Sequence, residues 1–243
     1  MPSVVVETKN LTKYYRNLLA VDHMNLKVKN REIYGLVGPN GAGKTTVIKI
    51  LCGLLLPSSG EAKVLGKKVP DKDLLTSIGY MPQELSLHMS LKVDQTLELY
   101  GRIFGFRKDE RLERGSKILK LTNLIDKKDE IVENLSGGEK RKLSLACALM
   151  HEPNLFFLDE PTVGIDPVLK ASFWKYFNSL KENGASILLT THYMDEVRRC
   201  DRVGFMYKGK IIADGHPNEI LKKTSTDSLE DAFFVLCQEV GSK

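Results

Sequence analysis

Residues 38–45 read Gly38-Pro39-Asn40-Gly41-Ala42-Gly43-Lys44-Thr45. This stretch matches the pattern G-x-x-x-x-G-K-[ST] at every fixed position. An apolar run, Ile33–Val37, leads into it, and an apolar-periodic stretch leads out of it. A strand, a glycine-rich loop and a helix in this order direct backbone N–H groups at a phosphate, at the positive end of the helix. The segment therefore predicts an α/β protein that binds a nucleotide.

The side chains expected to do chemistry lie in this loop and after a second apolar run. Lys44 is expected to reach the β- and γ-phosphates, and the Thr45 hydroxyl to ligate Mg²⁺. The run Leu155–Leu158 ends in Asp159 and Glu160, and ligands bind at the carboxyl ends of parallel strands. Asp159 therefore suits a Mg²⁺ contact, and Glu160 suits polarising the attacking water, a role that supplies about 10²–10⁴-fold in rate.

Composition limits the class of protein. The chain has 243 residues, 42% of them hydrophobic and 28% charged, as in an ordinary globular protein. The net charge of +5 is spread along the chain, so we expect no nucleic-acid partner. The longest apolar run, Ile50–Leu56, is far shorter than the roughly 20 residues that cross a bilayer, so no membrane span is expected.

The four cysteines predict neither a zinc site nor a disulfide framework. They are far apart and form no C-x-x-C pair, and they are Cys52, Cys147, Cys200 and Cys237. Reduced thiols are the simplest interpretation.

Apolar runs alternate with helical stretches, which indicates an α/β architecture. The strands that we predict are Val4–Glu7, Ile33–Val37, Ser77–Tyr80, Leu155–Leu158, Ile187–Thr190 and Val203–Tyr207. The last of them continues through Lys208-Gly209 into Ile211-Ile212-Ala213, which indicates a hairpin.

Between Gln83 and Leu135 the strand signals stop. Charged and apolar residues recur at near-helical spacing in residues 93–104 and 111–124, which predicts a mostly helical insertion. We expect an ATP-binding core in residues 1–84 and 155–222, a helical subdomain in residues 85–154, and a short amphipathic tail in residues 223–243.

The run Leu135-Ser136-Gly137-Gly138-Glu139 resembles the L-S-G-G-Q signature of ABC-type ATPases. Taken alone, a serine followed three residues later by a glutamate is a capping box that opens a helix. The two interpretations are compatible, because a capped helix N-terminus is also a favourable place for an anion.

Four further residues resemble motifs of the same family, in the expected order. Tyr15 resembles the aromatic residue that stacks on adenine, and Gln83 the glutamine that senses Mg²⁺ and the membrane partner. Asp166 lies in a segment that resembles the loop that communicates across the dimer. His192 resembles the histidine that contacts the γ-phosphate.

The resemblance implies a P-loop NTPase core with a mainly parallel sheet, an N-terminal antiparallel β region and a helical subdomain. It implies ATP and Mg²⁺ as cofactors. The implied catalytic residues are Glu160, His192 and Gln83, and the metal residues are Thr45, Gln83 and Asp159. The implied ATP-binding residues are Tyr15, Gly38, Pro39, Asn40, Gly41, Ala42, Gly43, Lys44, Thr45, Thr46, Ser136, Gly137, Gly138 and Asp166.

Position 139 departs from the family pattern, because glutamate stands where glutamine is commonest. A carboxylate that pointed at the triphosphate would repel it. A capping box would instead turn Glu139 back toward the backbone N–H of Ser136. We therefore expect weakened or unchanged activity, not its loss.

The resemblance also implies partners: ATP, a second copy of the chain or a homologous ATPase subunit, and a transmembrane permease at the cytoplasmic face of the cell membrane. Looser similarity to exporter-like subunits lies in Thr96–Gly105 and Ser228–Phe234. One alternative is a single-domain soluble ABC ATPase that acts in an assembly process such as iron–sulfur cluster formation. Another is that the chain is part of a longer transporter.

Overall fold

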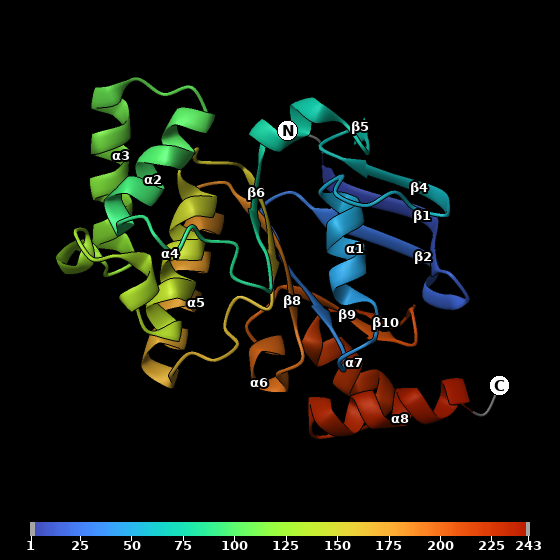
Figure 1. The fold of residues 1–243 in the computed structure, drawn as a ribbon. Helices are drawn as coiled ribbons and strands as arrows, with labels where there is room; N and C mark the ends of the chain where they lie inside the picture. The colour runs from blue at the N-terminus through green and yellow to red at the C-terminus, as the bar shows by residue number, and fades with distance from the viewer. Residues whose placement is uncertain (1–2, 242–243) are drawn as a thin grey trace.

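The computed structural model describes residues 3–241 and contains a six-stranded sheet in the order β10-β9-β3-β8-β7-β6 (Figure 1). All neighbouring strands in it are parallel except β9 and β10, which form the predicted hairpin. Its strands are β3 (Ile33–Val37), β6 (Ile78–Met81), β7 (Leu155–Asp159), β8 (Ser186–Thr191), β9 (Arg202–Tyr207) and β10 (Lys210–Gly215). Every residue of β3, β7 and β8 is buried, which confirms the predicted parallel sheet.

A second sheet is antiparallel and has the order β2-β1-β4-β5. Its strands are β1 (Val4–Tyr15), β2 (Leu18–Lys29), β4 (Ser59–Val64) and β5 (Lys67–Lys68). The prediction of a strand at Val4–Glu7 was too short, and β2, β4 and β5 were not predicted. For β1 the reason is local: register shifts interrupt the strand, and Asn10 in it adopts a positive φ of 47°, so the period of two is lost.

The helices cover both faces of the large sheet (Figure 1). Helix α1 stands between the two sheets, and its buried side chains share one apolar cluster with both of them. Helices α2 to α5 contribute to a different cluster, which includes side chains of the opposite face of the large sheet. The helices are α1 (Lys44–Leu51), α2 (Val93–Ile103), α3 (Lys108–Leu121), α4 (Gly137–Leu149), α5 (Pro167–Glu182), α6 (Met194–Val197), α7 (Pro217–Thr224) and α8 (Leu229–Gly241).

The insertion after Gln83 is helical, as predicted. Helix α2 fits the expected range 93–104 closely, whereas α3 begins and ends three residues before the expected range 111–124. The short 3₁₀ helices at Ile125–Lys127 and Val132–Asn134 complete the segment. The predicted amphipathic tail of residues 223–243 forms α8 over Leu229–Gly241, and α7 ends at its start, at Thr224. Within residues 3–241, no helix is both long enough and apolar enough to cross a bilayer.

Candidate nucleotide and catalytic site

The loop after β3 curls tightly around the ammonium group of Lys44. Lys44 Nζ donates hydrogen bonds to the carbonyl oxygens of Gly38 at 2.7 Å and Pro39 at 3.1 Å. Gly43 has a φ of 106°, and a Cβ built there would lie 2.2 Å from the carbonyl oxygen of Ala20. Only glycine fits this position, because the backbone conformation and the space both exclude a side chain.

Lys44 is buried and faces the acids at the end of β7. Its ammonium lies 3.4 Å from Oε1 of Glu160, and both side chains are about 5% exposed or less. Burial lowers the pKa of Lys44, while Glu160 and Asp159 act in the opposite direction. The strand order places β3 and β7 on either side of β8, which brings the loop and the acids together as predicted.

Asp159 is a buried carboxylate that has one partner and one free oxygen. Its Oδ1 accepts a hydrogen bond of 2.6 Å from the hydroxyl of Thr190, and its Oδ2 is buried without a hydrogen-bond partner. Desolvation raises the pKa of Asp159, while the neighbouring hydroxyls of Thr190 and Thr45 act in the opposite direction. A buried acceptor without a partner is costly, so this oxygen is a candidate ligand for a cation.

Glu160 is held in an uncommon backbone conformation, with a φ of 50°. Its backbone N–H donates to Thr190 Oγ1 at 2.8 Å, and its carboxylate Oε2 lies 3.0 Å from Nδ1 of His192. The carboxylate therefore lies between Lys44, at the start of α1, and His192, which follows β8.

The oxygen atoms around Asp159 fit Mg²⁺. Thr45 Oγ1 donates to Gln83 Oε1 at 3.4 Å, so these two side chains lie together. Across residues 3–241, no group of three or more His, Cys, Asp or Glu side chains forms a complete metal cage. Mg²⁺ needs no such cage, because it commonly takes one or two carboxylates and completes its shell with water and phosphate oxygens.

A cavity of about 310 Å³ opens at this loop. Tyr15, at the end of β1, lines its edge and is 43% exposed, as a side chain that stacks on a base would be. The other predicted residues that line it are Asn40, Gly41, Ala42, Gly43, Lys44, Thr45, Thr46, Gln83 and Glu160. The cavity does not include Ser136, Gly137, Gly138 or Asp166.

Ser136 and Glu139 form the predicted capping box at the start of α4. Glu139 Oε2 accepts from the backbone N–H and the hydroxyl of Ser136, both at 2.8 Å, and the backbone N–H of Glu139 donates to Ser136 Oγ at 3.3 Å. The hydrogen bonds from Ser136 lower the pKa of Glu139. The expectation that Glu139 turns back toward Ser136 is confirmed. Asp166 caps α5 with its side chain alone: its Oδ1 accepts from the backbone N–H groups of Val168 and Leu169, both at 3.0 Å.

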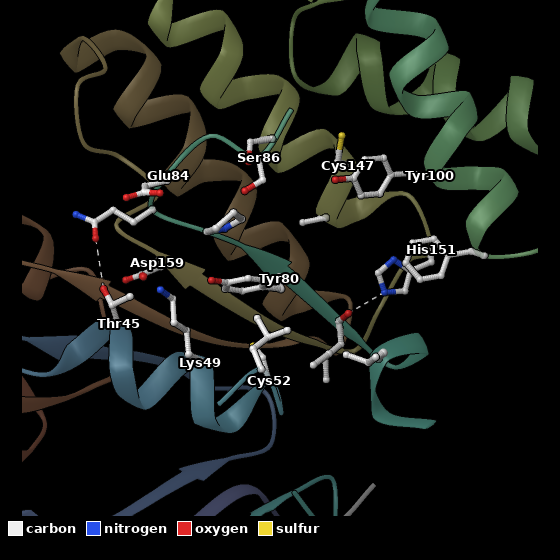
Figure 2. Close-up of a pocket in the computed structure, with 18 residues that line it drawn as sticks. Thr45, Lys49, Cys52, Tyr80, Glu84, Ser86, Tyr100, Cys147, His151 and Asp159 are labelled. Atoms are coloured by element: carbon white, nitrogen blue, oxygen red, sulfur yellow. Dashed lines mark hydrogen bonds between the residues drawn. The ribbon is translucent and has the colours of Figure 1, made fainter. Parts of the chain in front are cut away.

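A larger cavity, of about 470 Å³, lies between the core and the helical segment (Figure 2). Thr45, Gln83 and Asp159 line one side of it. His151 lines the opposite side, where its Nε2 lies 2.9 Å from the carbonyl oxygen of Ile78 and its ring stacks on Phe104. The sequence did not predict this cavity, because its walls come from distant segments.

Two polar residues of the site were also missed. Thr190 holds both acids, but in the sequence it is one of two consecutive threonines before His192. Arg141 is 8% exposed and donates from Nη1 to the carbonyl oxygen of Pro82 at 3.3 Å, next to Gln83. In the sequence Arg141 is one of several neighbouring basic residues, so no local signal distinguishes it from a solvated side chain.

Comparison with known proteins is consistent with this geometry. The family model for the ABC transporter matches residues 21–163, which include the loop, the signature and both acids. The chain belongs to the ABC transporter family. Within this family it is 41% identical, over 242 residues, to the probable multidrug ABC transporter ATP-binding protein YbhF of Escherichia coli (strain K12). The match covers 97% of this chain and 42% of that protein, so the chain spans less than half of its relative.

One further relative and two solved structures agree on the family. The Nod factor export ATP-binding protein I of Neorhizobium galegae is 40% identical over 224 residues, which cover 91% of this chain and 65% of that protein. A solved structure of an ATP-binding subunit of an ABC transporter aligns with a TM-score of 0.88 at 28% identity, covering 96% of this chain and 99% of that one. A dimeric, post-hydrolysis ATP-binding cassette bound to ADP and Pi aligns with a TM-score of 0.81 at 26% identity, covering 87% of this chain and 98% of that one.

The buried carboxylate of Asp159 leads to a first prediction. Because the folded state raises the pKa of Asp159, it holds that proton more tightly than the unfolded chain does. The nucleotide-free protein should therefore lose stability as pH rises from the unfolded pKa through the raised folded one. Asp159→Asn should remove this loss and increase the free energy of unfolding at pH 7 by about 1–3 kcal/mol, while weakening Mg²⁺-dependent ATP binding.

Urea unfolding at several pH values measures the first effect, and calorimetric titration with MgATP measures the second. Asp126→Asn, at an exposed position, is the control and should change neither. A less stable Asp159→Asn protein at pH 7 would contradict the prediction.

The capping box at Ser136 leads to a second prediction. Glu139→Gln keeps an oxygen that can accept from the Ser136 N–H and removes a negative charge from the start of α4. The variant should hydrolyse ATP as fast as the natural protein or faster, measured as phosphate release under saturating MgATP. Glu133→Gln, at an exposed position nearby, is the matched control. If Glu139→Gln abolished turnover, the interpretation that Glu139 only caps α4 and does not disturb ATP would be wrong.

Proposed function

We propose that this chain is the ATP-hydrolysing part of an ABC transporter and acts in export through a transmembrane partner. The single observation that carries the hydrolytic part is the Glu160 carboxylate, which is buried between Lys44 and His192 beside the unpaired oxygen of Asp159. A carboxylate, a cation, a histidine and a metal-binding oxygen in one enclosed place are the components that phosphoryl transfer to water requires.

Each side chain of the site has a role in this proposal. The loop N–H groups and Lys44 bind the phosphates, and Lys44 would exchange its contacts with Gly38 and Pro39 for phosphate oxygens. Glu160 accepts a proton from the attacking water, and His192 holds the Glu160 carboxylate in place. Asp159, Thr45 and Gln83 would hold Mg²⁺, which supplies charge neutralisation at the phosphates when bound.

The proposal requires two copies of the ATPase. Ser136 and Asp166 lie at the N-termini of α4 and α5, outside the cavity that holds Lys44. We place Ser136, Gly137 and Gly138 over the ATP of a second copy, where the start of α4 would face the phosphates. The post-hydrolysis cassette that resembles this chain is dimeric, which supports the arrangement.

The transport part of the proposal rests on the relatives and on the larger cavity. Relatives are described as multidrug transporter and Nod factor export proteins, which favours export over the assembly alternative. The cavity of Figure 2 reaches Gln83, and Leu54 and Leu75 among its lining residues are at least half exposed. We propose that the transmembrane partner contacts this apolar region at the cytoplasmic face of the membrane and thereby senses the nucleotide site.

Glu160→Gln tests the hydrolytic role. The variant keeps the size of the side chain but cannot accept the proton, so turnover should fall by about 10²–10⁴-fold. ATP binding should remain intact, and an ATP-bound dimer should accumulate in size-exclusion chromatography with MgATP. Glu182→Gln, at an exposed position at the end of α5, should behave as the natural protein does. Turnover close to the natural rate in Glu160→Gln would remove Glu160 from the role of base.

An affinity pull-down tests the transport role. The tagged protein is isolated from mild-detergent extracts of its native cells, and its partners are identified by mass spectrometry. The proposal expects a stoichiometric protein with several membrane spans. Soluble partners alone, with ATPase activity intact, would contradict the transport role and favour the assembly alternative.

A further inference from the structure

An ion-pair network joins the segments that follow Glu160 and His192 in the chain. Glu196, in α6, is 1% exposed, and its Oε1 accepts a hydrogen bond from the hydroxyl of Thr162. The same oxygen lies 3.0 Å from Nζ of Lys170, in α5. Three segments thus meet at one carboxylate oxygen: the turn after β7, the first turns of α5, and the helix after β8.

The network is not explained by stability alone. Oε2 of Glu196 is buried and has no hydrogen-bond partner, so this carboxylate depends on Lys170 for compensation of its charge. Burial acts to lower the pKa of Lys170, but hydrogen bonds to Glu196 and Asp195 raise it above its ordinary value. Ion pairs with a buried partner often contribute little net stability compared with apolar residues of the same size, so this pair, in which Lys170 is 18% exposed, requires another reason.

Its place in the chain supplies that reason. Thr162 follows Glu160 in the turn after β7, and the backbone N–H of Val163 donates to the carbonyl oxygen of Glu160 at 3.3 Å. Glu196 follows His192 in the helix after β8. The two segments that Glu160 and His192 join are therefore joined a second time by the contact between Thr162 and Glu196.

Lys170 extends the network to the surface that is proposed to face the second copy. Its backbone N–H donates to the carbonyl oxygen of Asp166 at 2.9 Å, within the first turn of α5. Movement of this end of α5 would therefore move Lys170 and, through Glu196 and Thr162, both loops that hold Glu160 and His192.

We propose that Glu196 is a positioning residue, which together with Lys170 and Thr162 couples the Asp166 end of α5 to the geometry of Glu160 and His192. The inference rests on the proposed ATPase function. It places no new group in contact with substrate. In this proposal, Glu196 and Lys170 keep Glu160 and His192 in their catalytic positions, and they do so only while the start of α5 stays in its observed position.

The test compares the two acidic partners of the same lysine in the full chain. Glu196→Gln keeps the size of the side chain and an acceptor for Thr162 but removes the charge that faces Lys170. Its kcat for MgATP should fall by about 10- to 100-fold with KM changed by less than about twofold, because small misplacements of catalytic groups can cost about 10²-fold. Asp195→Asn is the matched control: its side chain is 67% exposed and also pairs with Lys170, and its kcat should stay near the natural value.

Further variants separate positioning from folding. Lys170→Arg should retain more kcat than Lys170→Met, and the double variant Lys170→Met/Glu196→Gln should be no slower than its slower single variant, because both act through one contact. A merely structural role would lower the melting temperature and the fraction of protein that binds a fluorescent ATP analogue, while kcat per binding site stayed unchanged. If Glu196→Gln does not fold, Thr162→Val supplies the test, with a several-fold fall in kcat expected.

A kcat per binding site within about twofold of the natural value in Glu196→Gln, or an equal loss in Asp195→Asn, would overturn the proposal. If the protein is not an ATPase, the measurements would differ from both of these outcomes. In that case the natural protein and Asp195→Asn would show no turnover at all, and the positioning role would fall with it.

Discussion

The carboxylates at the end of β7 are the constraint on which the rest of the molecule depends. Two acids with side chains that are almost completely buried must be held by nearby donors and cations, because charge in a low-dielectric interior is otherwise very unfavourable. Thr190 holds Asp159 and the backbone of Glu160, while Lys44 and His192 hold the Glu160 carboxylate. The unpaired oxygen of Asp159 is the part of this arrangement that a cation would complete.

The sheet order follows from the same requirement. Strand β8 lies between β3 and β7, so the loop that contains Lys44, the acids and His192 all emerge at neighbouring strand ends. The antiparallel sheet contributes Tyr15 at the edge of this site, and the helical segment contributes Arg141 from the other side. Groups from four regions of the sequence therefore converge on one place. Asp159 and Glu160 are buried because these regions come together there.

Local patterns account for what could be predicted from the sequence. Continuous apolar runs revealed β3, β7 and β8, and the spacing of Ser136 and Glu139 predicted their reciprocal hydrogen bonds. Strand β2 was missed although its residues alternate between buried and exposed from Met24 to Lys29, and β4 was missed because only Ala62 and Val64 in it are buried. Thr190 and Glu196 were missed for a different reason. Their roles depend on contacts with side chains from distant segments, and the local sequence around a threonine or a glutamate does not reveal such contacts. The roles assigned to the site residues and the domain boundaries remain predictions.

The two apolar clusters have a consequence for how sequences of this kind can change. Alternate residues of β7 face opposite sides of the large sheet: Leu155 and Phe157 belong to the cluster with α1, whereas Phe156 and Leu158 belong to the cluster with the other helices. Substitutions in separate clusters that share no partners have nearly additive effects on stability. A substitution on the side of α2 to α5 should therefore leave the stability that the α1 cluster contributes nearly unchanged.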